Sequence, residues 1–190
     1  FFLLTAAHAV GRLGAIGARL MAAMLLLGLA RENLVAVRDW LYGFAELHLA
    51  LGAAPMIAAI IWGYSIYVAL CWAEGITATP WVIDGRVVQP SARALAAVGI
   101  FMVALVGFYE PLLDRVGMAK WEAGTRSTAG VPWIALIGYP SLSVPFVVGW
   151  ASIERRWTGS RRLIALTGWV VALAGLHAWG LQAVKDLLGW

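Results

Sequence analysis

The chain has 190 residues, of which 62% are hydrophobic and only 13% are charged, and its mean hydropathy is +0.83. A soluble globular domain carries about 45–50% apolar and about 25% charged residues, so this composition excludes an ordinary soluble globular domain. The formal net charge of +4 is modest, and a basic excess in such a chain reflects membrane topology rather than a nucleic-acid partner.

Long hydrophobic runs predict the helices. The first run, residues 1–10, is shorter than the roughly 20 residues that a membrane span needs, and we interpret it as the tail of a helix. The rival interpretation is the hydrophobic region of a signal peptide. The longer helices are expected at about residues 15–37, 53–74, 91–111, 131–152 and 161–185. The sequence therefore predicts an all-α, polytopic transmembrane helix bundle, with five full spans plus a partial N-terminal helix in a single domain over residues 1–190.

Turn signals and charges place the connections and the orientation. Residues 77–90 contain two prolines and Asp84-Gly85, and are expected to form a polar hairpin or loop. A dense group of arginines between residues 155 and 162 favours the cytoplasmic side of a bacterial or archaeal membrane for that loop. Four glutamates are then expected together at the opposite side: Glu32, Glu46, Glu110 and Glu122.

Glu110 is the strongest candidate for chemistry. It ends a run without other charges, and Pro111 after it is expected to end or bend the helix. A partly buried carboxylic acid at such a position can stay protonated at neutral pH and act as a general acid. The structural alternatives are a charge at the water interface and an ion pair with Arg115.

Two further carboxylates are candidates for the same site. Glu32 follows an apolar stretch, and Arg31 and Arg38 are possible partners, although neither stands at the helical spacing that shares its face. A snorkelling interfacial charge is the alternative for Glu32. Glu46 and His48 would share a face only on an extended segment.

The remaining charges and motifs point to no further site. Glu74 and Glu154 are expected to be ordinary interfacial charges, and His8 and His177 to be satisfied packing residues. The sequence contains no HExxH, GxGxxG or P-loop motif and no aspartate-rich pair for magnesium-bound diphosphate, so it predicts neither a metal nor another cofactor. Proton chemistry on an apolar substrate remains, with aromatic faces available to stabilise a cation.

Two ordered segments between Glu32 and Trp150 carry a family resemblance. The first runs from Tyr42-Gly43-Phe44 to Leu51-Gly52 and continues with Pro55 and Trp62. The second consists of Glu110-Pro111, Trp121, Gly130-Val131-Pro132 and Gly138-Tyr139. Together they resemble a family of membrane carotenoid-biosynthesis proteins that includes the carotenoid 1,2-hydratases, and integral membrane terpene cyclases are a related group. The chain departs from the family's pattern at Ala45, Leu47, Glu110, Ala123 and Ala135, where the family has tyrosine, tyrosine, aspartate, tryptophan and asparagine.

The resemblance implies an enzyme that acts on a lipophilic isoprenoid delivered from the membrane lipid. Glu110 would protonate a double bond or an epoxide, and water or an internal double bond would capture the carbocation. Glu32 or Glu46 would receive the final proton or orient the water. The implied substrate-binding residues are Tyr42, Trp62, Tyr109, Trp121 and Tyr139.

A different class of function is also compatible with the carboxylates. They would serve proton coupling in a small transporter, or helix docking in a membrane-assembly subunit. The absence of an inverted repeat and of a carboxylate in mid-span argues against the transporter, because transport sites usually lie near the middle of the bilayer. The sequence leaves the number of subunits open.

Overall fold

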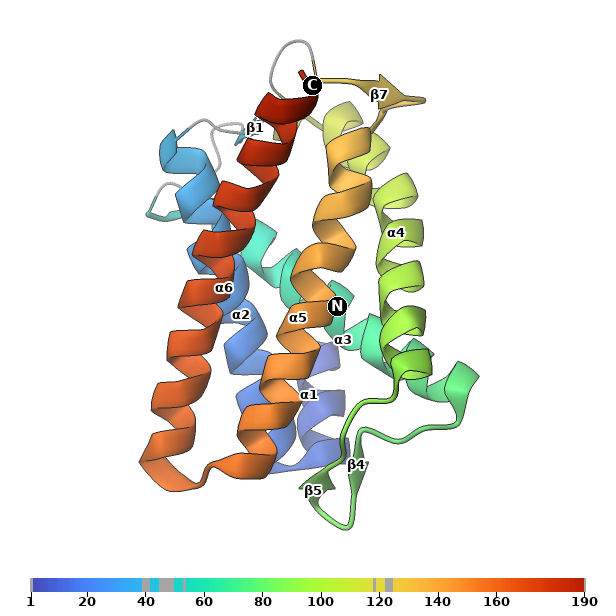
Figure 1. The fold of residues 1–190 in the computed structure, drawn as a ribbon, viewed down its shortest axis with the longest axis vertical. Coiled ribbons are helices and arrows are strands. Elements are labelled where there is room, and N and C mark those ends of the chain that lie inside the picture. Colours follow the sequence, from blue (N-terminus) through green and yellow to red (C-terminus); the bar gives the residue numbers. More distant parts are fainter. Residues whose placement is uncertain are drawn as a thin grey trace.

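The computed structural model describes residues 2–38, 42–44, 50–52, 54–117, 119–121 and 125–189, and most of them are helical. Helices α2, α4, α5 and α6 run roughly along the long axis of the molecule, and α3 is inclined to them (Figure 1). The helices are α1 (Phe2–Leu13), α2 (Ala15–Arg38), α3 (Met56–Thr77), α4 (Ala92–Arg115), α5 (Trp133–Arg156) and α6 (Gly159–Leu188). The all-α prediction is confirmed, and each expected helix is present with ends within about one helical turn of the prediction.

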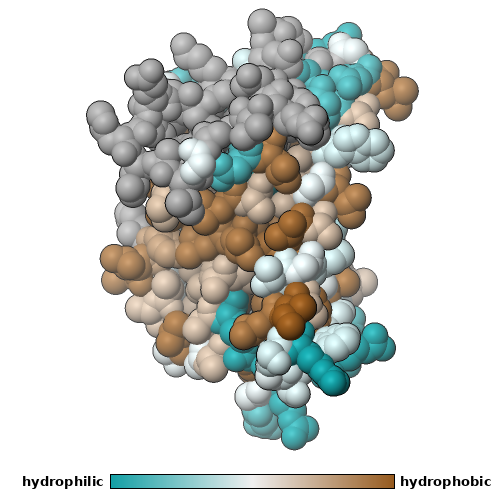
Figure 2. Space-filling view, turned by 90° about the vertical axis from the view of Figure 1, so that its left-hand side faces the viewer, coloured by the Kyte–Doolittle hydropathy of each residue, from teal (hydrophilic) through white to brown (hydrophobic). Residues whose placement is uncertain are grey.

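Four of the described helices, α3 to α6, are long and apolar enough to cross a membrane. Figure 2 shows apolar side chains in a broad band across one face, with hydrophilic residues gathered below the band. Such a band is what a lipid-facing surface requires, because hydrocarbon cannot solvate polar groups. The structure thus supports four helices that could span a membrane, and a fifth full span remains a prediction.

Pro111 does not end its helix. The α4 helix continues through Pro111 to Arg115, and the backbone N–H of Val116 then donates to the carbonyl of Leu112. A proline removes one backbone donor from a helix. Here the loss falls in the last turns, where the following residues keep their own helical bonds. The expectation that Pro111 ends the helix was therefore wrong, and a bend there remains a prediction.

Short antiparallel strand pairs occupy the connections. The pair β4 (Val82–Ile83) and β5 (Arg86–Val87) confirms the predicted hairpin around Asp84-Gly85. The pair β1 (Tyr42–Phe44) and β6 (Ala119–Trp121) joins the α2–α3 connection to the α4–α5 connection, with Tyr42 opposite Trp121. The other pairs are β2 (Ala50–Leu51) with β3 (Ala54–Pro55) and β7 (Ser127–Thr128) with β8 (Val131–Pro132).

Five helices close into a ring. Helix α2 packs against α3, α3 against α4, α4 against α5, α5 against α6, and α6 packs back against α2, while α1 lies against α2 and α3. Buried side chains from every member fill the interior, among them Leu27, Ile66, Met102, Phe146 and Leu173. Gly28 permits the close approach of α2 and α3, because a Cβ there would lie 2.7 Å from the Cα of Ala59.

Candidate functional site

Buried and half-buried polar side chains gather inside the ring, toward one end of the bundle. Figure 1 shows β1 and the C-terminus at this end. Every helix of the ring contributes to this cluster, and β6 adds a tryptophan. A polar group inside a hydrophobic bundle is costly unless it has a partner, so the contacts of each one define what the site can do. The members are Arg31 and Glu32 of α2, Trp62 of α3, Glu110 of α4, Tyr139 of α5, His177 of α6 and Trp121 of β6.

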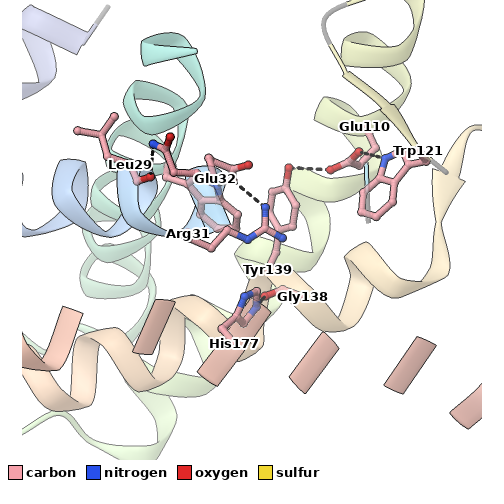
Figure 3. Close-up of polar contacts among 10 residues, drawn as sticks. Leu29, Arg31, Glu32, Glu110, Trp121, Gly138, Tyr139 and His177 are labelled. Atoms are coloured by element: carbon pink, nitrogen blue, oxygen red, sulfur yellow. Dashed lines mark hydrogen bonds and ion pairs between the residues drawn. The ribbon is translucent and has the colours of Figure 1, made fainter. Parts of the chain in front are cut away.

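Glu110 is buried and held at both oxygens. Its residue is only 5% exposed. The indole N–H of Trp121 donates to Oε2 over 2.7 Å, and the hydroxyl of Tyr139 donates to Oε1 over 2.8 Å (Figure 3). The sequence prediction of a partly buried carboxyl at this position is confirmed, and the alternative of a charge at the water interface is not what the structure has.

The two donors of Glu110 are chemically unequal. An indole N–H can only donate, whereas a hydroxyl can both donate and accept. A proton on Oε1 of Glu110 would therefore point to the Tyr139 oxygen and leave the Trp121 contact in place. The same geometry accommodates the carboxylic acid and the carboxylate, which is what a group that gives and regains a proton requires.

Glu32 lies in a second set of contacts. It is 1% exposed, and its Oε1 accepts from Arg31 Nη1 at 2.7 Å and from Trp62 Nε1 at 2.5 Å. The Arg31 guanidinium carbon also lies 5.6 Å from the centre of the Trp62 ring, within reach of a cation–π interaction. Arg31, one of the two possible partners, is thus paired with Glu32, although helical spacing did not favour it, because the long arginine side chain bends back to its neighbour. Glu32 is a buried ion-pair member rather than a snorkelling charge.

An aromatic contact links the two carboxylates. The rings of Trp62 and Tyr139 have centroids 4.8 Å apart and are tilted by 41°. Trp62 contacts Glu32, and Tyr139 contacts Glu110, so the chain of contacts runs from one carboxylate to the other across α2, α3, α5 and α4. Figure 3 shows Glu32 and Glu110 on either side of Tyr139.

His177 reaches the same region from α6. Its Nε2 lies 2.8 Å from the carbonyl oxygen of Gly138, which can only accept, so this nitrogen carries hydrogen and Nδ1 of the neutral ring is an acceptor. Nδ1 is buried and has no hydrogen-bond partner within the part of the chain that the structure describes. His177 was expected to be a packing residue with its hydrogen bonds satisfied, and this holds for Nε2 but not for Nδ1. The only sequence signal for a place of His177 in this site was a histidine in an apolar helix.

The other predicted site residues lie elsewhere or outside the described part. Tyr109 is half-buried, and its ring lies 5.5 Å from that of Phe108. Tyr109 immediately precedes Glu110, so the two side chains leave α4 in directions about 100° apart around the helix axis. Glu46 and Glu122 lie outside the described residues. Tyr42 is placed only by its backbone, opposite Trp121, and its side chain also lies outside the described part.

The opposite end of the bundle collects arginines around one glutamate. Glu154 is 8% exposed, and its carboxylate accepts from Arg19 over 2.7 Å and 2.8 Å and lies 3.2 Å from Arg162. The expectation of an ordinary interfacial charge was wrong here. Glu74 pairs with Arg12 at the same end and is more exposed, as an interfacial charge should be.

Within the described residues, no group of three or more histidine, cysteine, aspartate or glutamate side chains is placed to hold a metal ion. No protein-family model matches the chain, and neither does any curated protein or solved structure.

Proposed function

We propose that the protein is an integral membrane enzyme that protonates a double bond or an epoxide of a terpenoid or carotenoid, which leads to hydration or cyclisation. The observation that carries this proposal is the buried Glu110 carboxyl between Trp121 and Tyr139, inside a ring of apolar helices. The resemblance of the two ordered segments to carotenoid 1,2-hydratases favours the same chemistry and an isoprenoid substrate.

The first step is proton transfer from Glu110 to an alkene carbon. A C–H bond forms, the π bond breaks, and the adjacent carbon becomes a cation while Glu110 becomes a carboxylate. For an epoxide, the proton goes to the ring oxygen and a C–O bond breaks instead. Tyr139 and Trp121 are hydrogen-bonded to Glu110, so in this proposal they are the aromatic residues that shelter the positive charge. Aromatic faces stabilise cations without reacting as bases.

The cation is then captured in one of two ways. In hydration, water attacks the cationic carbon and gives its extra proton to a carboxylate. In cyclisation, an internal double bond attacks, and a neighbouring C–H loses its proton to a carboxylate. Glu110 and Glu32 are the described carboxylates joined through Tyr139 and Trp62, so Glu32 is the second proton acceptor of this proposal.

A buried position for this acid has a chemical purpose. An alkene is a weak base, and its protonation competes with protonation of water. The apolar ring around Glu110 keeps bulk water from the acid and from the cation, which otherwise would be trapped before rearrangement. The lipophilic substrate reaches such a site from the bilayer rather than from solution.

The test is mass spectrometry of lipid extracts from a host that makes carotenoids and terpenoids, with and without this chain. The wild type should convert an isoprenoid to a product that either carries one added water or keeps its formula with a changed retention time. Glu110→Gln should abolish that product while the protein is still expressed and folded. Asp114→Asn is the matched control, because Asp114 lies one turn later on α4 and is exposed.

The outcomes separate the functional classes. Product from Glu110→Gln at the wild-type level would remove Glu110 from the mechanism. Unchanged isoprenoids with the wild type, in a host that contains the substrates, would favour the transporter or assembly-subunit alternative.

A further inference from the structure

A cavity lined by several charged residues lies at the end of the bundle opposite Glu110. It has a volume of about 450 Å³, and four arginines and one glutamate are among the residues that line it. These arginines come from α2, from the β4–β5 hairpin, from the last turn of α5 and from the start of α6. The charged residues of its lining are Arg19, Arg86, Glu154, Arg155 and Arg162. Four positive charges against one negative charge leave an excess of three, so the cavity favours an anion.

The buried Glu154 fixes part of this arrangement. It holds Arg19 through two hydrogen bonds, one of them from Nε and one from Nη2, and it lies 3.2 Å from Arg162. A guanidinium has five N–H donors, so Arg19 keeps donors for a ligand while its fork is held in place. Arg86 and Arg155 do not depend on Glu154, and Arg155 is hydrogen-bonded to Gln89. The cavity therefore combines oriented and exposed guanidinium groups, the pattern that suits a phosphate group.

An apolar groove begins at the same place. It has a volume of about 120 Å³ and lies between α2 and α6, and Arg19 lines both the groove and the arginine-lined cavity. Ala22 and Ala23 give the groove its depth on the α2 side because their side chains are small. Leu163, Leu166 and Val170 form most of the facing wall on α6. The groove extends over about two turns of α6, roughly 10 Å along the helix axis.

We propose that this cavity and groove together bind an anionic phospholipid of the membrane. The phosphate lies among Arg19, Arg86, Arg155 and Arg162, and one acyl chain lies in the groove between α2 and α6. The charge of the cavity matches a lipid phosphate, and the groove continues from it in the direction of the membrane-spanning helices. A soluble phosphate would use the cavity and leave the groove without an occupant. The acyl chain is the feature that decides for a lipid.

The test is native mass spectrometry of the purified full chain, delipidated in detergent and titrated with equal amounts of phosphatidylglycerol and phosphatidylcholine. The wild type should retain phosphatidylglycerol in preference to phosphatidylcholine. The variant R86Q/R155Q should lose this preference by about five-fold for each arginine removed. Arg156→Gln is the matched control, because Arg156 is exposed beside Arg155 but does not line the cavity.

A second pair of variants tests the groove. Ala22→Phe places a large side chain in the groove and should lower phosphatidylglycerol retention, whereas Ala172→Phe adds the same side chain to an exposed position of α6 outside it. Both changes replace exposed residues, so the fold should tolerate them. Inorganic phosphate, added alone in the same titration, should fail to displace the lipid at equal concentration.

Three results would overturn the proposal. The first is equal retention of the two lipids by the wild type. The second is a loss of preference in the Arg156→Gln control as large as in R86Q/R155Q. The third is displacement of the lipid by inorganic phosphate together with wild-type behaviour of Ala22→Phe, which would assign the cavity to a soluble anion. All three readouts are independent of isoprenoid turnover, so they do not depend on the proposed enzymatic function.

Discussion

The ring of Tyr139 packs against the indole of Trp62, with centroids 4.8 Å apart, and in doing so connects two carboxylates that belong to different helices. The hydroxyl of Tyr139 binds Glu110, and the indole N–H of Trp62 binds Glu32. A change in the position of either ring is therefore felt at both carboxylates. The ring of Tyr139 contacts Trp62 and its hydroxyl binds Glu110, so substitution by phenylalanine removes the second contact and keeps the first.

Tyr139→Phe should lower product formation while leaving most of the bundle intact. The ring and its contact with Trp62 are retained, and only the hydrogen bond to Glu110 is lost. A hydrogen bond to a charged group is worth about 1.5–3 kcal/mol, so we expect a fall in rate of roughly ten-fold or more. The measurement is product yield per folded protein in the lipid extracts described above.

Tyr67→Phe is the matched control for this variant. Its hydroxyl is also hydrogen-bonded, at 2.8 Å to His8 Nδ1, but it has no contact with either carboxylate among those the structure gives. We expect Tyr67→Phe to lower the free energy of unfolding about as much as Tyr139→Phe does, and to leave the product yield normal. If both variants lowered the yield equally, the role assigned to the Tyr139 hydroxyl would be wrong.

Glu32→Gln should destabilise the fold because Arg31 would keep its charge in a buried position. Removal of one partner from a buried ion pair costs about 3–5 kcal/mol. The pair lies at 4% and 2% side-chain exposure, so solvent screening is small. The free energy of unfolding, measured with denaturing detergent in mixed micelles, should fall by that order.

The double variant R31M/E32Q should recover part of this loss, since the buried positive charge of Arg31 is removed together with the negative charge of Glu32. Arg31→Met, Glu32→Gln and the double variant form a cycle, and its coupling energy should be clearly non-zero. Strictly additive effects would show that Arg31 and Glu32 do not stabilise each other.

The periodic features of the sequence predicted the helices and turns well. They did not predict the contacts between segments that are far apart in the chain. Hydrophobic runs and turn residues depend on neighbours along the chain, so the helices and the β4–β5 hairpin were found within about one turn. The burial of Glu110 was also predicted, because a single acid closing an uncharged run beside a proline is a local pattern. The pairing of Tyr42 with Trp121 joins segments far apart in the chain, and no local pattern indicates it.

The sequence was a weak guide at Arg31 and a wrong one at Glu154, for different reasons. Helical spacing describes where Cβ atoms point, and it does not describe where a flexible arginine ends, so Arg31 was named as a possible partner of Glu32 without support from spacing. Glu154 stands among arginines near a predicted helix end, which is the usual position of an exposed charge. Its burial follows from the packing of Arg19 of α2 against the end of α5, a contact that needs the closed ring.

Glu154→Gln should lower stability without touching the proposed chemistry. The amide keeps its size but gives Arg19 and Arg162 no negative charge, and we expect a loss of roughly 1–3 kcal/mol in the free energy of unfolding. Product yield per folded protein should be unchanged, because Glu110 lies at the other end of the bundle.

Glu74→Gln is the control for this variant. The pair of Glu74 with Arg12 is more exposed and should contribute less than about 1 kcal/mol to the free energy of unfolding. A larger effect at Glu74 than at Glu154 would contradict this ranking.

Gly28→Ala should impair both the fold and the site. The added Cβ would lie 2.7 Å from the Cα and 3.0 Å from the carbonyl oxygen of Ala59, so α2 and α3 must move apart. Overpacking of this kind typically costs about 1–3 kcal/mol. The same Cβ would lie 3.2 Å from Cβ of Trp62, whose indole binds Glu32 and contacts Tyr139, so product yield should fall as well.

Gly168→Ala on α6 is the control, because a Cβ at Gly168 would have no atom within 4 Å. This variant should raise the free energy of unfolding slightly, through the higher helix propensity of alanine, and leave the product yield normal. Equal behaviour of the two alanine variants, in unfolding and in yield, would show that the α2–α3 approach does not position Trp62.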